Sequence, residues 1–184
     1  MSKKNNYRSY ITSTIAILFI LLSSLEVKAQ PWNQLGLDMD GEGAYNQSGS
    51  SVSASDDGLT VAIGAPYNSE NGNFAGHVRV YKYNGTAWVQ LGADIDGEAA
   101  NDNSGSSVSI SGDGLSVAIG ASGNDGSGYA AGHVRVYTYN GTAWVQQGAD
   151  IDGEAAYDNS GISVSISGDG LTVVIGAYYN DTFN

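Results

Sequence analysis

The sequence predicts an all-β protein made of repeated, four-stranded antiparallel units, and three observations support this prediction. Glycine accounts for 26 of the 184 residues, about twice its average frequency, which disfavours long helices because glycine is costly in helix interiors. Short segments alternate polar and apolar residues, as half-buried strands do. A gapless internal period of 56 residues places Trp32, Trp88 and Trp144 in register. Such a period is typical of propeller blades or of another stacked array.

Each unit is expected to contain four short strands, which are clearest in the second copy. These strands are expected at 107–111, 117–121, 133–139 and 142–146. Asp113-Gly114 is a hairpin signal between the first two strands, and Asn140-Gly141 is another between the last two. Small Gly, Ala and Ser side chains would let neighbouring sheets approach closely, so the low aliphatic content does not preclude a core.

The period also predicts the division of the chain. We expect a signal peptide at 1–29, an N-terminal strand and inter-blade loop at 30–47, repeats at 48–103 and 104–159, and a partial repeat at 160–184. Within the second of these segments, Trp32–Leu37 resembles the fourth strand of a unit. Known propellers have about 4–8 blades, so the two and a half present here cannot close a ring alone. We therefore expect a fragment of a larger propeller, with a ring assembled from several chains as the alternative.

The N-terminus is typical of a secretory signal peptide. Basic Lys3, Lys4 and Arg8 precede an apolar run at 15–22, and the Val-Lys-Ala motif predicts cleavage after Ala29. The run is too short to span a bilayer, so we expect no stable membrane span after cleavage; a retained anchor is the alternative. Losing four cations and one anion would change the net charge from −12 to −15, which disfavours nucleic acid and anionic lipid as partners. The expected location is therefore secreted or at the cell surface.

Two short landmarks recur in the units, a Ser-Gly pair and a Gly-Ala-Pro type triplet. They occur as Ser48-Gly49, Ser104-Gly105 and Ser160-Gly161, and as Gly64-Ala65-Pro66, Gly120-Ala121-Ser122 and Gly176-Ala177-Tyr178. With the recurring GHVRVY and YNGTAW strings, they resemble the FG-GAP repeat of integrin alpha-subunit propellers, and especially bacterial secreted repeat proteins, over essentially all of 32–184. This resemblance implies a β-propeller outside the cell, used for adhesion or protein contacts and rarely for catalysis.

Many integrin-type blades carry an Asp-rich Ca²⁺ loop between the two landmarks, and this sequence departs from that pattern. The corresponding hairpins hold only Asp56 and Asp57, Asp113, or Asp169. A Ca²⁺ ion takes six to eight oxygen ligands, which one or two aspartates do not supply. The family's calcium site is therefore not expected at these turns.

A different acidic motif, Asp-x-Asp-Gly-Glu, occurs once per unit. The candidate metal ligands are Asp38, Asp40, Glu42, Asp94, Asp96, Glu98, Asp150, Asp152 and Glu154. Alternate carboxylates of an extended segment point the same way and could hold Ca²⁺, with Asp102 or Asp158 completing the shell. The favoured interpretation is a turn between blades in which the Asp side chains bind local backbone N–H groups. No other cofactor is expected.

Histidine, arginine and aromatic residues recur with the repeat, which favours structural roles. His77 and His133 each begin a strand without a second histidine nearby, while Arg79 and Arg135 are expected to connect acidic loops. Cross-strand packing is favoured for the aromatic residues, which could alternatively form a glycan-binding surface. These are Trp32, Trp88, Trp144, Tyr81, Tyr83, Tyr137 and Tyr139. The absence of cysteine excludes disulfides, thiolate metal sites and cysteine nucleophiles.

These features predict an exported, non-catalytic binding or adhesion module whose partner is an extracellular protein or glycan. One alternative is a purely architectural matrix or stalk protein, and another is a non-catalytic part of a larger secreted propeller enzyme. Catalysis would require a non-repeated cluster of acid, base and nucleophile, and residues 30–184 supply none. Further blades are expected from a longer chain or from other copies.

Overall fold

The structure is a computed structural model that describes residues 32–181. The chain divides into two units, Met1–Gln34 and Leu35–Asn184, and every strand of the described residues lies in the second. The described residues contain strands and turns but no helix, which confirms the all-β prediction. No helix in this part of the chain is long and apolar enough to cross a membrane. The predicted signal peptide at 1–29 lies outside the described residues.

The first sheet follows the chain in a simple antiparallel meander. It consists of β1 (Ser51–Ala54), β2 (Thr60–Ala65), β3 (His77–Tyr83) and β4 (Trp88–Gln90), with β5 (Ile95–Asp96) also paired to β3. The Asp57-Gly58 turn joins β1 to β2, because Gly58 adopts the positive φ of 68° that this hairpin requires. The four predicted strands are therefore consecutive neighbours in one sheet.

The second and third sheets repeat this plan. The second contains β6 (Ser104–Ile110), β7 (Ser116–Ala121), β8 (His133–Tyr139), β9 (Trp144–Gln146) and β10 (Ile151–Asp152), and the third contains β11 (Ser163–Ile166) and β12 (Val173–Gly176). The strand register repeats as well: Ile63 is paired with Arg79, and Ile119 is paired with Arg135. The 56-residue period of the sequence is therefore a structural period.

Two details differ from the sequence-based expectation. The segments between units form the short strands β5 and β10, because Ile95 and Ile151 extend the hydrogen-bonded edge of β3 and β8 beyond β4 and β9. The strand expected at Trp32–Leu37 is not formed: residues 32–50 contain no strand. A strand requires a hydrogen-bonding partner, and the third strand of a preceding unit, its expected partner, is absent from the described residues.

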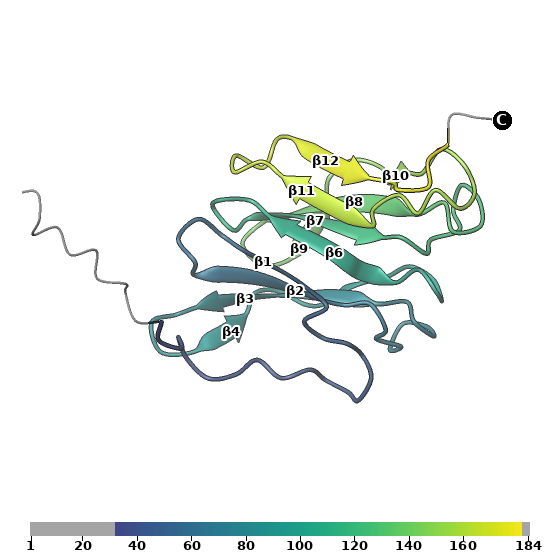
Figure 1. Ribbon diagram of the computed structural model, residues 1–184. Helices are drawn as coiled ribbons and strands as arrows, with labels where there is room; N and C mark the ends of the chain where they lie inside the picture. Colours follow the sequence, from purple (N-terminus) through teal and green to yellow (C-terminus); the bar gives the residue numbers. More distant parts are fainter. Residues whose placement is uncertain (1–31, 182–184) are drawn as a thin grey trace, which may run out of the picture. The chain divides into compact units, whose positions relative to one another are not determined.

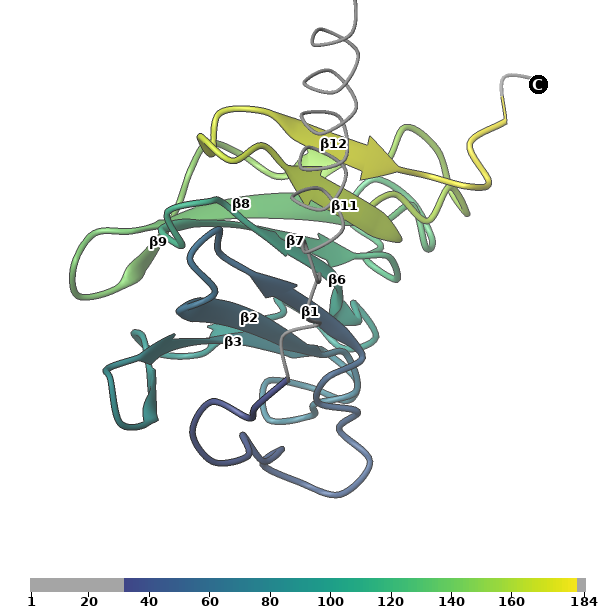
Figure 2. The same cartoon turned by 60° about the vertical axis from the view of Figure 1, so that its left-hand side comes forward.

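The three sheets lie face to face, as both views of the ribbon show (Figures 1 and 2). Strand β6 contacts β1, β2 and β3, and β11 contacts β6 and β7. The core between the first two sheets contains Ala62, Val78, Val80, Ile95, Val108, Ile110, Val117, Ile119 and Tyr137. A smaller cluster of Ala118, Val134 and Ile166 lies between the second and third sheets. The second sheet is therefore covered on both faces.

Glycines allow the sheets to approach one another closely. A Cβ atom placed on Gly64 would overlap the carbonyl oxygen of Gly105 in the second sheet. A Cβ atom on Gly120 would likewise overlap the carbonyl oxygen of Gly161 in the third unit. The two recurring landmarks of the sequence therefore meet across each interface between units.

Serine side chains add hydrogen bonds between the sheets. Ser51 Oγ donates to Gly105 O at 2.7 Å, and Ser107 Oγ donates to Gly161 O at the same distance. In the opposite direction, the backbone N–H of Ile110 donates to Ser53 Oγ at 3.0 Å. The polar residues of β1 and β6 thus fix the register of each sheet on the next.

Candidate functional site

The acidic segment between units places carboxylates beside a buried histidine. In the first sheet, β5 pairs Asp96 with His77, and in the second, β10 pairs Asp152 with His133. His77 Nδ1 lies 3.6 Å from Asp94 Oδ2 and 3.8 Å from Glu42 Oε2, although the histidine side chain is only 2% exposed. Direct hydrogen bonds of this kind are about 2.7–3.2 Å long, so the imidazole faces both carboxylates without being bonded to either.

The second unit has a similar arrangement, but there the two carboxylates within 4.0 Å of the histidine are Asp150 and Asp152. His133 Nδ1 lies 3.6 Å from Asp150 Oδ2 and 4.0 Å from Asp152 Oδ1. The ligand atoms of Glu98, His133 and Asp150 all lie within 4.8 Å of one another. Burial lowers the pKa of His133, and Arg135 lowers it further against the opposing effect of Asp150 and Glu98. This imidazole is therefore neutral at neutral pH.

Each carboxylate facing a histidine is held by a second group. Arg79 Nη1 donates to Glu42 Oε1 at 3.2 Å, and Arg79 Nη2 donates to the backbone oxygen of Asp40 at 3.0 Å. Gln90 Nε2 donates to Asp94 Oδ1 at 2.5 Å. In both carboxylates, the second oxygen is left facing His77. Arg79 was expected to connect acidic loops, and its contacts instead join a single acidic segment, the one containing Asp40 and Glu42, to β3.

The same supports occur 56 residues later. Arg135 Nη1 lies 3.2 Å from Glu98 Oε1, and Gln146 Nε2 donates to Asp150 Oδ1 at 2.6 Å. The Arg135 guanidinium also lies over the Tyr137 ring, 5.7 Å from its centroid. The carboxylate–histidine arrangement is therefore a property of the repeat.

The structure groups the predicted acidic residues in an unexpected way. Glu42 belongs to the first acidic segment and Asp94 to the second, yet they face the same histidine. From the sequence, carboxylates of one segment are expected to act together and the histidines separately from them. The spacing of 35 residues from Glu42 to His77, repeated from Glu98 to His133, is the sequence signal that could have linked them.

The remaining acidic candidates have other surroundings. Burial raises the pKa of Asp96, and the neighbouring Asp94 raises it further. Asp102 Oδ2 accepts a hydrogen bond from the backbone N–H of Ala99, so this side chain binds its own turn. Asp158 makes the equivalent contact to Ala155. The other candidates lie elsewhere: Asp38 and Asp40 line a pocket beside Trp88, and Glu154 Oε2 accepts from Asn180 Nδ2.

The hairpin aspartates bind their own turns. In the second unit, Asp113 Oδ1 accepts hydrogen bonds from Ser111 Oγ at 2.6 Å and from the backbone N–H of Leu115 at 2.9 Å. These two hydrogen bonds hold the pKa of Asp113 below its ordinary value, and the bond from Ser111 has the larger effect. Asp57 and Asp169 make equivalent contacts and have similarly lowered pKa values.

These three aspartates predict a loss of stability in acid. A carboxyl group whose pKa is lower in the folded state stabilises the fold above its unfolded pKa of about 3.9, and this contribution disappears as the pH falls through the folded value. The triple variant D57N/D113N/D169N should therefore show a smaller loss of stability between about pH 4 and pH 2 than the parent protein. Urea unfolding at several pH values measures the free energy of unfolding of the variant and of the parent protein. An equal fall in this free energy for the two proteins would contradict the prediction.

The recurring aromatic residues pack across strands. The Tyr83 and Trp88 rings are 5.4 Å apart, and the Trp88 indole N–H donates to Leu35 O at 2.6 Å. Tyr139 and Trp144 form the equivalent pair in the second unit. These contacts agree with the structural interpretation of the pairs, whereas the Trp32 side chain is fully exposed.

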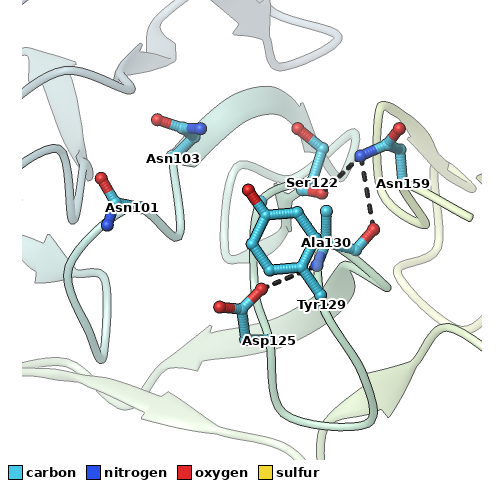
Figure 3. Close-up of a pocket in the computed structure, with 8 residues that line it drawn as sticks. Asn101, Asn103, Ser122, Asp125, Tyr129, Ala130 and Asn159 are labelled. Carbon is cyan, nitrogen blue, oxygen red and sulfur yellow. Dashed lines mark hydrogen bonds between the residues drawn. The ribbon is translucent and has the colours of Figure 1, made fainter. Parts of the chain in front are cut away.

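A polar pocket of about 350 Å³ lies among three loops, which join β5 to β6, β7 to β8 and β10 to β11. Its lining is drawn in Figure 3 and consists of Asn101, Asn103, Ser122, Gly123, Asp125, Tyr129, Ala130 and Asn159. The Tyr129 side chain is 66% exposed, and its ring contacts that of Tyr157 at a centroid distance of 5.3 Å. The pocket thus combines an accessible aromatic ring with several amides.

Internal hydrogen bonds fix one side of this pocket. Asn159 Nδ2 donates to Ser122 O at 3.1 Å, and Asp125 Oδ1 accepts from the backbone N–H of Ala130 at 2.7 Å (Figure 3). Asn101 and Asn103 have positive φ angles of 70° and 55°, a region that asparagine tolerates better than most residues. Their side-chain amides make no hydrogen bond within residues 32–181, so they are available to a ligand.

The lining of this pocket departs from the repeat. Seven of its eight residues differ from those found 56 positions earlier; Tyr129, for example, replaces Asn73, and Asp125 replaces Ser69. By contrast, β8 differs from β3 at one position only, where Thr138 replaces Lys82. The sheets are therefore copied between units while the pocket is not.

Comparison with known proteins identifies the repeat. Residues 150–184 match the family model of the FG-GAP repeat, which confirms the resemblance carried by the two landmarks. The matched stretch overlaps the segment 144–184, which is identical to 88–128 at 31 of 41 positions. No curated protein sequence matches the chain.

Proposed function

We propose that this chain is an exported, non-catalytic binding module that presents the loop pocket around Tyr129 to an extracellular partner. The observation that carries the proposal is the divergence of this pocket within an otherwise conserved repeat. A site required only for folding would be copied with the sheets, as the carboxylate–histidine arrangement is. Loops on a rigid β scaffold are also where proteins commonly place binding residues.

The chemistry of the pocket favours a glycan over a protein as the partner. Sugars are bound by stacking on an exposed aromatic ring together with directional hydrogen bonds from amides and carboxylates. Tyr129 provides such a ring, Asn101 and Asn103 provide amides, and Asp125 keeps one oxygen free of its bond to Ala130. A volume of about 350 Å³ is large enough for one or two sugar rings.

Two further features support the other parts of the proposal. Export is supported by the basic residues, apolar run and Ala29 of the N-terminus. A non-catalytic role is supported by His77 and His133, which occupy equivalent positions with equivalent acidic neighbours, as repeated structural groups do. A purely architectural role would not explain why the residues that line the pocket differ from those 56 positions earlier.

Changing Tyr129 to the residue of the preceding unit should abolish binding without harming the fold. The variant Y129N removes the stacking surface and leaves the backbone contacts of Asp125 and Asn159 in place. On a glycan array, we expect the parent protein to retain a defined set of sugars and Y129N to bind them at least about tenfold more weakly, the equivalent of about 1.4 kcal/mol.

Tyr45 provides the matched control, since it is 93% exposed and does not line the pocket. Y45N should bind like the parent protein. Equal binding by all three proteins would place the site elsewhere, and an absence of glycan binding combined with capture of a protein partner would overturn the glycan assignment. Cells displaying the chain should also adhere to a surface coated with the retained sugar, and a failure to adhere would contradict the adhesive role.

A further inference from the structure

We propose that His77 and His133 are each the centre of a binding site for a divalent transition-metal ion, formed between consecutive repeats with zinc as the reference occupant. Glu42 and Asp94 complete the first site, and Glu98 and Asp150 complete the second. These sites involve none of the residues of the loop pocket, so their presence and the proposed binding function are tested independently.

The first observation is an unsatisfied buried nitrogen. His77 is 1% exposed, and its Nδ1 atom has no hydrogen-bond partner among the described residues. Buried polar atoms are nearly always paired, since leaving one unpaired costs about 1–3 kcal/mol. Nδ1 faces Asp94 Oδ2 and Glu42 Oε2 at 3.6 and 3.8 Å, which is beyond direct hydrogen bonding. An ion between these three atoms would satisfy all of them.

The separations agree with shared coordination. Two ligands about 2.0–2.2 Å from a tetrahedral zinc ion lie about 3.3–3.6 Å from one another. The nitrogen-to-oxygen distances at His77 therefore require a contraction of only a few tenths of an ångström. The equivalent distance at His133, from Nδ1 to Asp150 Oδ2, is also 3.6 Å, although the unpartnered nitrogen of His133 is Nε2.

The second observation is that the ligands are already oriented. Glu42 is held through one oxygen by Arg79, and Asp94 is held through one oxygen by Gln90, so that in each case the other oxygen faces His77. Hydrogen bonds of this kind to the outer oxygen of a carboxylate ligand are a regular feature of metal sites. The repetition of both supports at Arg135 and Gln146 shows that the orientation belongs to the repeat.

The donor set selects the class of metal. Ca²⁺ and Mg²⁺ are bound by oxygen atoms, whereas an imidazole nitrogen suits Zn²⁺ and its first-row neighbours. At the second site, one histidine and two carboxylates supply three ligands, which leaves one tetrahedral position for water. The inference thus differs from the calcium site that carboxylates alone would favour.

The two sites should differ in affinity. Glu70 adds a third carboxylate within 4.8 Å of the other ligand atoms at the first site, and Gly126 takes its place in the second unit. The additional anion attracts a cation and supplies a fourth protein ligand. We therefore expect the first site to bind the metal more tightly, and the variant E70G should make the two affinities similar.

Titration of the full chain, freed of metal by chelator, provides the test. Isothermal titration with Zn²⁺ should give two ions per chain and raise the melting temperature, and Ca²⁺ should give neither result. Titration with Co²⁺ should produce visible absorption bands from nitrogen and oxygen coordination, which report on the ligands without depending on stability.

Variants of the second site make the assignment specific. H133Q should remove one of the two ions, and E98Q should weaken the same site by at least about tenfold. Glu98 is 48% exposed, so E98Q is expected to remain folded even if H133Q does not. The matched control D113N changes a carboxylate outside the cluster and should retain both ions.

Three results would overturn the inference. The first is the absence of Zn²⁺ binding and of Co²⁺ bands in the parent protein. The second is zinc binding that persists with unchanged stoichiometry in H77Q/H133Q, or with unchanged affinity in E98Q. The third is an equal response to Ca²⁺, which would assign the cation to the carboxylates without the histidines.

Discussion

Replacing Gly120 with alanine is expected to lower the free energy of unfolding by about 3 kcal/mol, because overpacking a close contact forces the backbone to move. The new Cβ atom would overlap the carbonyl oxygen of Gly161, a backbone atom that cannot rotate away. Gly120 does not have a positive φ, so alanine fits its local conformation and the cost arises from the neighbouring unit. Urea denaturation monitored by tryptophan fluorescence measures the loss.

Gly176 provides the matched control in the third unit. A Cβ atom placed there would meet Ser163 Oγ, a side-chain atom that can rotate, and no backbone atom of another unit within 3.5 Å. G176A should therefore change stability by less than about 1 kcal/mol, as surface substitutions usually do. An equal effect at both positions would show that the glycine is needed within its own sheet rather than for sheet stacking.

Truncating Ile119 to alanine should cost about 2–5 kcal/mol, the range measured for removing a fully buried aliphatic side chain. Ile119 is 1% exposed because its face of the second sheet packs against the first sheet. Ile63 occupies the same position in the first sheet but is only partly buried, since no sheet among the described residues covers that face. I63A should consequently be less destabilising, although the chemical change is the same.

Chemical denaturation of I119A and I63A compares the two positions directly. A similar loss from both would mean that the outer face of the first sheet is covered in solution, by association between copies or by other parts of the chain. Measuring both variants over a hundredfold range of protein concentration distinguishes association, because only stability gained from association depends on concentration.

The fold was predictable because short sequence patterns that are weak alone recur in each repeat. The alternation around Val108 and the Asp113-Gly114 turn would each be modest alone, but they recur at a fixed distance. The strands β5 and β10 were missed because two residues are too few for a periodic pattern. The strand expected at Trp32–Leu37 does not form, although its sequence is suitable. Strand formation requires a hydrogen-bonding partner, and the described residues do not supply one.

The sites were less predictable than the fold. Glu42 and His77 are 35 residues apart, and they meet only because the strand-free segment that precedes β1 lies beside the start of β3. The pocket around Tyr129 escaped sequence analysis because its members come from three loops and share no motif. What these residues share is that most of them differ from the residues found 56 positions earlier. This difference becomes informative only when the structure shows that the residues line one pocket.

The equivalence of the two interfaces has a consequence for how such a protein can change length. An in-frame deletion of residues 79–134 would join Val78 to Arg135, and Glu42 would then meet Arg135 in place of Arg79, as Gly64 would meet Gly161 in place of Gly105. Removing or adding a whole unit in this way creates no mismatched junction, because each junction keeps the same contacts.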